Sequence, residues 1–360
     1  MLILATACTD DQQPSRRSVS LVALLSDNSV LLLDADGRST ALSLGEPSQV
    51  GLPLSRRILV DRATQRAYVL APGSDGEDLL HVVDLRARSL IRACGSLGGR
   101  FRTITWANQR TVYAIGDRPA ALAIVRISTD DCRIVSQHSF PLDARFDWFV
   151  YRAIVTPDER QLLVSYHGAR TTGVDRFDLA ADARCAARAA PNLGCLQAHG
   201  NVELWEQGVI TTSGEDGLYV FDGEDRRVRK LDVGLPGDHV MEFAIADDGA
   251  RAYVIGSCIY ARGLSAVDLQ TGSVEVINPS RVATSLCGER IVLQDADTAA
   301  LLQSAIVPTR DPGTILVDVN LHTGAGYRTI KLANLGLVDL AVADVEAADA
   351  GPNQCAVGAG

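Results

Sequence analysis

The protein has 360 residues, 47% of them apolar and 22% charged, with 31 glycines and 13 prolines. This composition is close to ordinary globular usage and excludes a disordered, collagen-like or coiled-coil chain. The formal charge of −10 argues against a nucleic-acid groove or an anionic bilayer as the main partner, because both require a positive surface. The sequence contains no run of about 18 apolar residues, the length that a transmembrane helix needs.

The chain begins with a short, largely apolar run, Met1–Ala7, which ends in small residues directly before Cys8. This pattern resembles the lipobox of bacterial lipoproteins, in which the cysteine becomes the lipidated first residue. A signal peptide needs about 15 to 30 residues, so we expect the natural start upstream and residues 1–17 to be a truncated signal and tether. The protein is then a periplasmic or outer-membrane lipoprotein that meets the membrane only through its lipid anchor. The alternative is a chance apolar start on a cytoplasmic protein.

The other cysteines fit an exported protein, because disulfides persist in oxidising compartments. Cys185 and Cys195 flank a short loop, and we expect them to form a local disulfide. The pairing of the remaining five stays open: Cys94, Cys132, Cys258, Cys287 and Cys355. No Cys-x-x-Cys, His-x-His or His-x-x-x-His spacing occurs in the sequence, so we expect no metal site.

A unit of four short strands recurs along the chain. Its marker is an acidic residue at the end of an apolar strand, and the six intervals between the first and last marker average about 47 residues. The markers are Asp34, Asp84, Arg126 (in place of Asp), Asp178, Asp222, Asp268 and Asp318. In the second unit the expected strands are 58–60, 67–70, 79–85 and 89–94.

The first unit contains only three expected strands, 19–25, 29–35 and 40–44. The apolar run 337–345 supplies a fourth from the other end of the chain. Pairing it with the first unit closes a ring and removes the exposed sheet edge. We therefore predict an all-β, seven-bladed β-propeller of four-stranded antiparallel blades over residues 18–346, followed by a tail at 347–360.

Two blade turns carry a family resemblance. Asp247–Val254 and Val267–Gly272 resemble the turns of YVTN-type seven-bladed propellers. That family includes surface-layer and periplasmic proteins of diverse role, so the resemblance implies a fold and an exported location but no catalytic residue. Eight-bladed PQQ dehydrogenases have a similar repeat style, but the tryptophans of this chain are not spaced like theirs. We expect no cofactor.

The register of the repeat nominates residues for the central channel. Counting 11 residues back from the expected second-strand positions Tyr68, Tyr113, Leu163, Tyr253 and Val292 gives Arg57, Arg102, Arg152, Glu242 and Arg281. The closing strand adds Asp339, the fifth unit adds His199 or Asn201, and His239 comes shortly before Glu242. A ring of guanidinium groups would attract a carboxylate or phosphate. Alternatively, ion pairs with Glu242 and Asp339 fill the channel as a structural lining.

Two functions remain open at this point. The first is a lipid-anchored binding or scaffolding module for an unknown protein or a small anionic ligand. The second is a lactonase-type hydrolase, in which His199 or His239 acts with Arg152 and Glu242 on a sugar acid or phosphate. A histidine within hydrogen-bond reach of a channel arginine would favour the enzyme, and ion pairs that fill the channel would favour the module.

Overall fold

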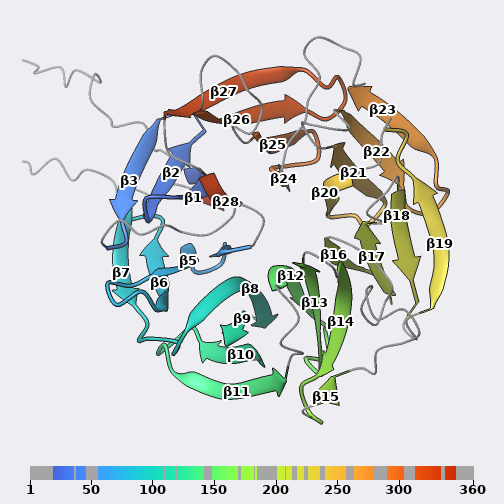
Figure 1. The fold of residues 1–360 in the computed structure, drawn as a ribbon. Helices are drawn as coiled ribbons and strands as arrows, with labels where there is room; N and C mark the ends of the chain where they lie inside the picture. Colours follow the sequence, from blue (N-terminus) through green and yellow to red (C-terminus); the bar gives the residue numbers. More distant parts are fainter. Residues whose placement is uncertain are drawn as a thin grey trace, which may run out of the picture.

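The structure is a computed structural model. It describes residues 19–35, 38–45, 56–108, 110–118, 121–141, 148–168, 172–181, 183–184, 201–206, 208–212, 217–222, 226–235, 240–256, 263–278, 290–303, 313–333 and 337–345. These residues form seven four-stranded antiparallel sheets arranged in a ring around a central channel (Figure 1). The prediction of a seven-bladed β-propeller is confirmed. Within the described ranges, no helix has the length and hydropathy needed to span a membrane.

Each blade is numbered here from its innermost strand outward. Blade 1 consists of β28 (Leu337–Val345), β1 (Val19–Leu25), β2 (Ser29–Asp34) and β3 (Ser39–Ser43); blade 2 of β4 (Ile58–Asp61), β5 (Arg66–Pro72), β6 (Asp78–Asp84) and β7 (Ser89–Ala93); blade 3 of β8 (Arg100–Asn108), β9 (Thr111–Arg118), β10 (Ala121–Ser128) and β11 (Ile134–Pro141). Blade 4 consists of β12 (Trp148–Val155), β13 (Gln161–Gly168), β14 (Thr172–Asp178) and β15 (Ala183–Arg184).

The remaining blades follow the same plan. Blade 5 consists of β16 (Val202–Trp205), β17 (Gly208–Thr212), β18 (Gly217–Phe221) and β19 (Arg227–Asp232); blade 6 of β20 (Val240–Ile245), β21 (Arg251–Gly256), β22 (Leu264–Asp268) and β23 (Val274–Asn278); blade 7 of β24 (Arg290–Leu293), β25 (Thr298–Gln303), β26 (Gly313–Asn320) and β27 (Gly326–Ala333).

The ring closes through the last strand of the chain. β28 pairs antiparallel with β1, with Ala341 opposite Val22 and Leu340 opposite Ala23. Blade 1 therefore combines one strand from the end of the propeller with three from its beginning, as the sequence predicted. Because β28 is paired, β1 does not present a free edge toward the channel.

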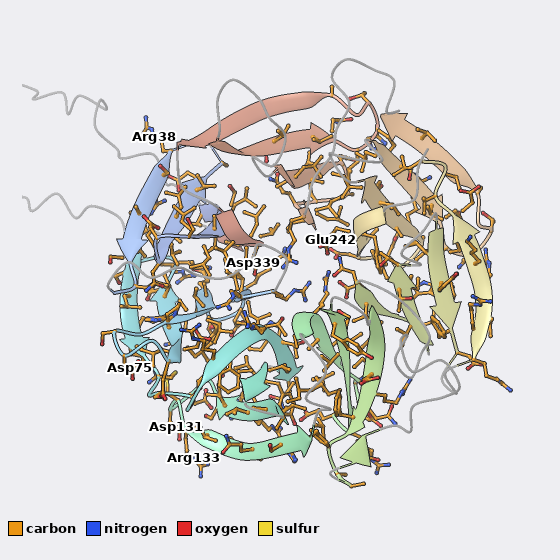
Figure 2. All side chains as sticks on the ribbon, in the orientation of Figure 1. Arg38, Asp75, Asp131, Arg133, Glu242 and Asp339 are labelled. Carbon is orange, nitrogen blue, oxygen red and sulfur yellow. A yellow bond between two sulfur atoms is a disulfide. The ribbon has the colours of Figure 1, made fainter. Side chains whose placement is uncertain are left out.

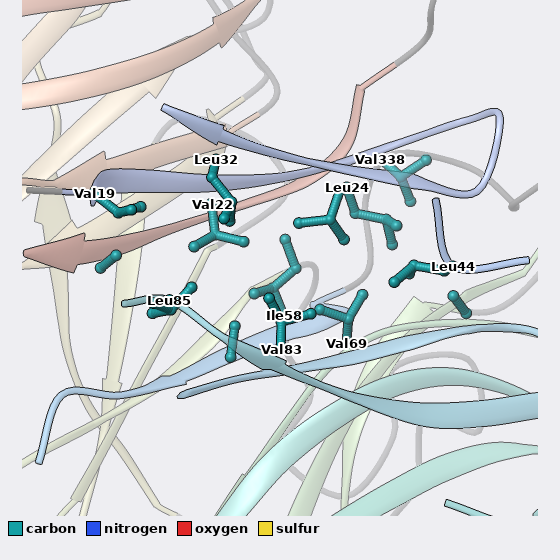
Figure 3. Packing of buried hydrophobic residues seen from close by; sticks show 14 residues of the cluster. Val19, Val22, Leu24, Leu32, Leu44, Ile58, Val69, Val83, Leu85 and Val338 are labelled. Atoms are coloured by element: carbon teal, nitrogen blue, oxygen red, sulfur yellow. The ribbon is translucent and has the colours of Figure 1, made fainter. Parts of the chain in front are cut away.

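Both faces of each blade are apolar because each blade is packed between two neighbours. On β1, Val22 and Leu24 are fully buried against Val69 of blade 2 (Figure 3). The alternate residue Leu21 faces the other way, into a cluster that includes Ala300 of blade 7. Since successive side chains of a strand point to opposite faces, one apolar strand contributes to two interfaces. Full burial of such a side chain is worth about 1.5 to 3 kcal/mol.

The acidic residue that marks the repeat is a turn former. In blade 6, the carboxylate of Asp268 accepts a hydrogen bond from the backbone N–H of Thr271 at 2.7 Å. Gly272 follows with a φ of 78°, a conformation that glycine adopts without strain. Asp84 and Asp178 cap the corresponding turns of blades 2 and 4 in the same way. The repeated Asp therefore belongs to the fold rather than to a site.

A disulfide joins two neighbouring blades. Cys94, which follows β7 in blade 2, is bonded to Cys132 in the β10–β11 turn of blade 3, with 5.1 Å between the two Cα atoms. The sequence left these two cysteines unassigned. Cys8, Cys185 and Cys195 lie outside the described residues, so the lipidation site and the local disulfide stay predictions.

Candidate functional site: the central channel

The innermost strands bring six charged side chains together in the channel. We call them the channel cluster: Arg56, Arg152, Glu203, Glu242, Arg290 and Asp339. They come from the segment before β4 and from β12, β16, β20, β24 and β28. Figure 2 shows the labelled Glu242 and Asp339 at the inner side of the ring. The cluster thus draws on six of the seven blades.

The members of the channel cluster alternate in sign along a chain of ion pairs. Arg152 donates through Nη1 to Glu242 Oε1 at 2.6 Å and through Nη2 to Glu203 Oε1. Arg290 donates through Nη2 to Asp339 Oδ1 at 2.5 Å, and its Nη1 lies 3.6 Å from Glu242 Oε2. Nη2 of Arg56 lies 3.7 Å from Glu203 Oε1. The ion pairs connect blades that are not neighbours in the ring.

Irregular strand pairing helps to aim these side chains. The register between β12 and β13 shifts between Val150 and Arg152, and the register between β20 and β21 shifts between Val240 and Glu242. An extra residue in one strand re-aims the side chain that follows it. In blade 3 the same shift precedes Thr103, whose hydroxyl donates to the Arg56 carbonyl oxygen at 2.9 Å. Blade 3 therefore supports the cluster through the backbone.

The cations of the cluster are not equally compensated. Burial disfavours the charge of Arg290, but the carboxylates of Asp339 and Glu242 outweigh this effect and raise its pKa. Burial and the neighbouring Arg152 charge lower the pKa of Arg56 to about 10. The side chain of Arg56 is 29% exposed and shares the Glu203 carboxylate with Arg152. Arg56 is therefore the cluster cation with the weakest carboxylate contact.

A cavity of about 390 Å³ adjoins the channel cluster. Its charged end is formed by Arg56, Arg152, Glu203, Glu242 and Arg290, and Arg62 and Asp247 lie among its other polar residues. The remaining lining residues are apolar and come from the innermost strands. The volume falls within the range of small-molecule sites, about 300 to 1,000 Å³.

Arg152, Glu242 and Asp339, which the sequence nominated, belong to the channel cluster. Arg57 does not contribute its guanidinium to it. That group is buried, donates to the carbonyl oxygens of Leu70 at 3.3 Å and Phe101 at 2.9 Å, and thereby ties blade 2 to blade 3. The adjacent residue, Arg56, lines the cavity instead.

Arg102 is half-buried and lies on the irregular part of β8. Burial, with the Arg102 charge nearby, lowers the pKa of Arg57 against the opposing effect of Asp78. Arg102 therefore acts electrostatically on this buried inter-blade group. His199, His239 and Arg281 lie outside the described residues, and their expected place in the channel stays a prediction.

Sequence reasoning missed Arg56, Glu203 and Arg290. Val292, used as a second-strand marker, lies on β24, the innermost strand of blade 7. The count from it therefore began one strand too early. Arg290 was visible as the first residue of the apolar run 290–293, and Glu203 as the charged residue within 202–205. Within the part of the chain that the structure describes, no group of three or more His, Cys, Asp or Glu residues is arranged to hold a metal ion.

No protein-family model matches the sequence, and no curated protein is detectably similar to it in sequence. Solved structures are similar in fold. A Bacteroides fragilis protein, named provisionally as a 6-phosphogluconolactonase, matches with a TM-score of 0.59 and 12% identity over 92% of this chain and 99% of its own. The periplasmic gluconolactonase of Pseudomonas aeruginosa matches with 0.56 and 14% identity over 90% and 99%. These likenesses support the seven-bladed propeller fold.

Proposed function

We propose that the protein is a lactone hydrolase whose site is the channel cavity beside the channel cluster. The observation that carries the proposal is the convergence of two arginines and one accessible carboxylate on this cavity. Arg56 and Glu203 have side chains that are 29% and 21% exposed, whereas Glu242 and Asp339 are almost fully covered. Nη1 of Arg290 has no hydrogen-bond partner among the described residues.

The chemistry follows from these positions. Water attacks the acyl carbon of the lactone, and the Glu203 carboxylate accepts the proton that the water releases. Arg290 Nη1 and Arg56 stabilise the oxyanion that forms on the carbonyl oxygen. The ring C–O bond then breaks, the leaving oxygen takes the proton from Glu203, and the product is a hydroxy acid.

The similar structures support this choice of reaction, since two of them carry gluconolactonase names. Gluconolactone and its 6-phosphate are therefore the first substrates to assay. The exported, lipid-anchored location expected from Cys8 is part of the same proposal.

A second candidate is a binding or scaffolding module without chemistry. It is favoured by the ion pairs, because Glu242, Glu203 and Asp339 occupy guanidinium groups of Arg152 and Arg290. The described residues lining the cavity include no histidine.

Lactone hydrolysis, followed by the release of acid at constant pH, separates the two candidates. We expect the wild type to cleave a lactone and Glu203→Gln to lose at least about 100-fold in rate. Glu159→Gln is the matched control, because Glu159 forms a partly exposed ion pair with Arg126 at 2.7 Å far from the cavity. A wild type that cleaves no lactone overturns the hydrolase and leaves the module. Equal loss in both variants overturns the role of Glu203.

A further inference from the structure

An apolar layer lies directly beyond the charged end of the cavity. Ala244, Val292 and Ala341 each come two residues after a member of the channel cluster on β20, β24 and β28. Residues two apart on a strand point to the same face, and all three line the same cavity as the charges. Val60, Trp106 and Leu204 complete the layer from β4, β8 and β16.

The members of this apolar layer are half-buried, although they lie on the innermost strands. Two of them, Ala244 and Ala341, are small and leave room that larger residues would fill. Trp106 is held in place by an edge-on contact with Tyr68, with 5.4 Å between the ring centroids. The layer is therefore a preformed wall of the cavity.

This wall is poorly suited to a polyhydroxylated ligand. Among the described lining residues outside the channel cluster, the charged ones are Arg62 and Asp247. Hydroxyl groups placed against Ala244, Val292 and Ala341 would lose their hydrogen bonds to water without replacement, which disfavours binding. An alkyl or aromatic group in the same place would instead lose only unfavourable contact with water.

We propose that the ligand of this cavity is amphiphilic, with its carboxylate or lactone carbonyl at Arg56 and Arg290 and an alkyl or aromatic body against the apolar layer. This inference rests on the proposed function for the reaction, but it concerns the substrate class. The preferred lactone carries an apolar substituent, in contrast to the hydroxyl-rich ring of gluconolactone.

The direct test is calorimetric binding of carboxylates to the full chain. Hexanoate and gluconate have carbon chains of equal length and differ in the hydroxyl groups, so they form a matched pair. We expect hexanoate to bind at least tenfold more tightly than gluconate. From acetate to hexanoate, affinity should rise about fourfold for each added methylene.

Filling the cavity provides an independent arm of the test. Ala244→Leu should weaken hexanoate binding at least tenfold and leave acetate binding within twofold of the wild type. Ala341→Leu serves the same purpose from β28 if the first variant does not fold. Ala87→Leu makes the same change at an exposed turn of blade 2 and should leave both affinities unchanged. Melting curves establish which variants are folded.

The outcomes separate this inference from the hydrolase. Tighter binding of gluconate, binding of no carboxylate, or unchanged hexanoate affinity in folded Ala244→Leu and Ala341→Leu overturns the apolar class, even if gluconolactone is cleaved. Hexanoate binding with the expected chain-length dependence upholds it, even if no lactone is cleaved and the hydrolase fails.

Discussion

Asp339 Oδ1 lies 2.5 Å from Arg290 Nη2, which joins the closing strand β28 to β24 across the boundary between blades 1 and 7. The other oxygen of the same carboxylate accepts the backbone N–H groups of Arg57 and Ile58 in blade 2 at 2.5 and 2.8 Å. One buried side chain therefore holds three consecutive blades at the point where the ring closes.

We predict that Asp339→Ala destabilises the protein by about 3 to 5 kcal/mol, because it leaves the buried charge of Arg290 without its nearest partner. Denaturant unfolding measures the change. Asp297→Ala removes an exposed carboxylate that pairs with His322 at 2.7 Å and should cost less than about 1 kcal/mol. Similar losses in the two variants would contradict the role of Asp339 in closure.

Arg56 and Arg57 are adjacent but should behave in opposite ways. Arg57→Ala removes a buried group with two carbonyl partners and should lower the free energy of unfolding by about 2 to 4 kcal/mol. Arg56→Ala, at a partly exposed position, should cost less than about 1 kcal/mol but weaken hexanoate binding. Unfolding and calorimetry on both variants decide the assignment, and a loss of binding confined to Arg57→Ala would reverse it.

His81 on β6 should make the protein sensitive to acid. It is fully buried, and burial lowers its pKa to about 4, with the Ala71 carbonyl opposing the shift. The unfolded chain takes up this proton below about pH 6.5, whereas the folded protein resists it until about pH 4. Stability is therefore complete above pH 6.5 and falls by up to about 3 kcal/mol as the pH drops toward 4.

Denaturant unfolding at a series of pH values tests the role of His81. His81→Leu, which cannot take up a proton, should remove this part of the pH dependence. His322→Asn, at an exposed turn, should retain it. An unchanged pH profile in His81→Leu would assign acid sensitivity to other groups.

The Cys94–Cys132 disulfide should stabilise the ring by about 4 kcal/mol, because it closes a loop with a sequence separation of 38 residues. The double variant Cys94→Ala/Cys132→Ala removes this bond without reducing other cysteines. Denaturant unfolding with and without a thiol reductant should show a large loss in the double variant and no further loss at this pair on reduction. Equal stability of variant and wild type would contradict the prediction.

The fold was predictable because its signals are local. Strand alternation, the turn-forming Asp268 and Gly272, and an unpaired apolar run at 337–345 each follow from a few neighbouring residues. The Cys94–Cys132 pair was not, because only the packing of blade 2 against blade 3 brings the two cysteines together.

The site was predictable only in part, because channel-facing positions depend on register. The 11-residue count located Arg152 and Glu242, which follow register shifts in their strands. In blade 2 the cavity-lining residue is Arg56, one position away from the count, since neighbouring residues of a strand face opposite sides. Val292 misled the count because an innermost strand and a second strand are both short and apolar.

The pairing of Val22 with Ala341 also determines the order in which the protein can fold during synthesis. Strands β1, β2 and β3 leave the ribosome first, but their blade lacks its innermost strand until the rest of the propeller has been made. Contacts between such distant parts of a chain form slowly. During that interval the inner edge of β1 is open to pairing with another chain, so the final stretch of translation is the period in which this protein is most exposed to misassembly.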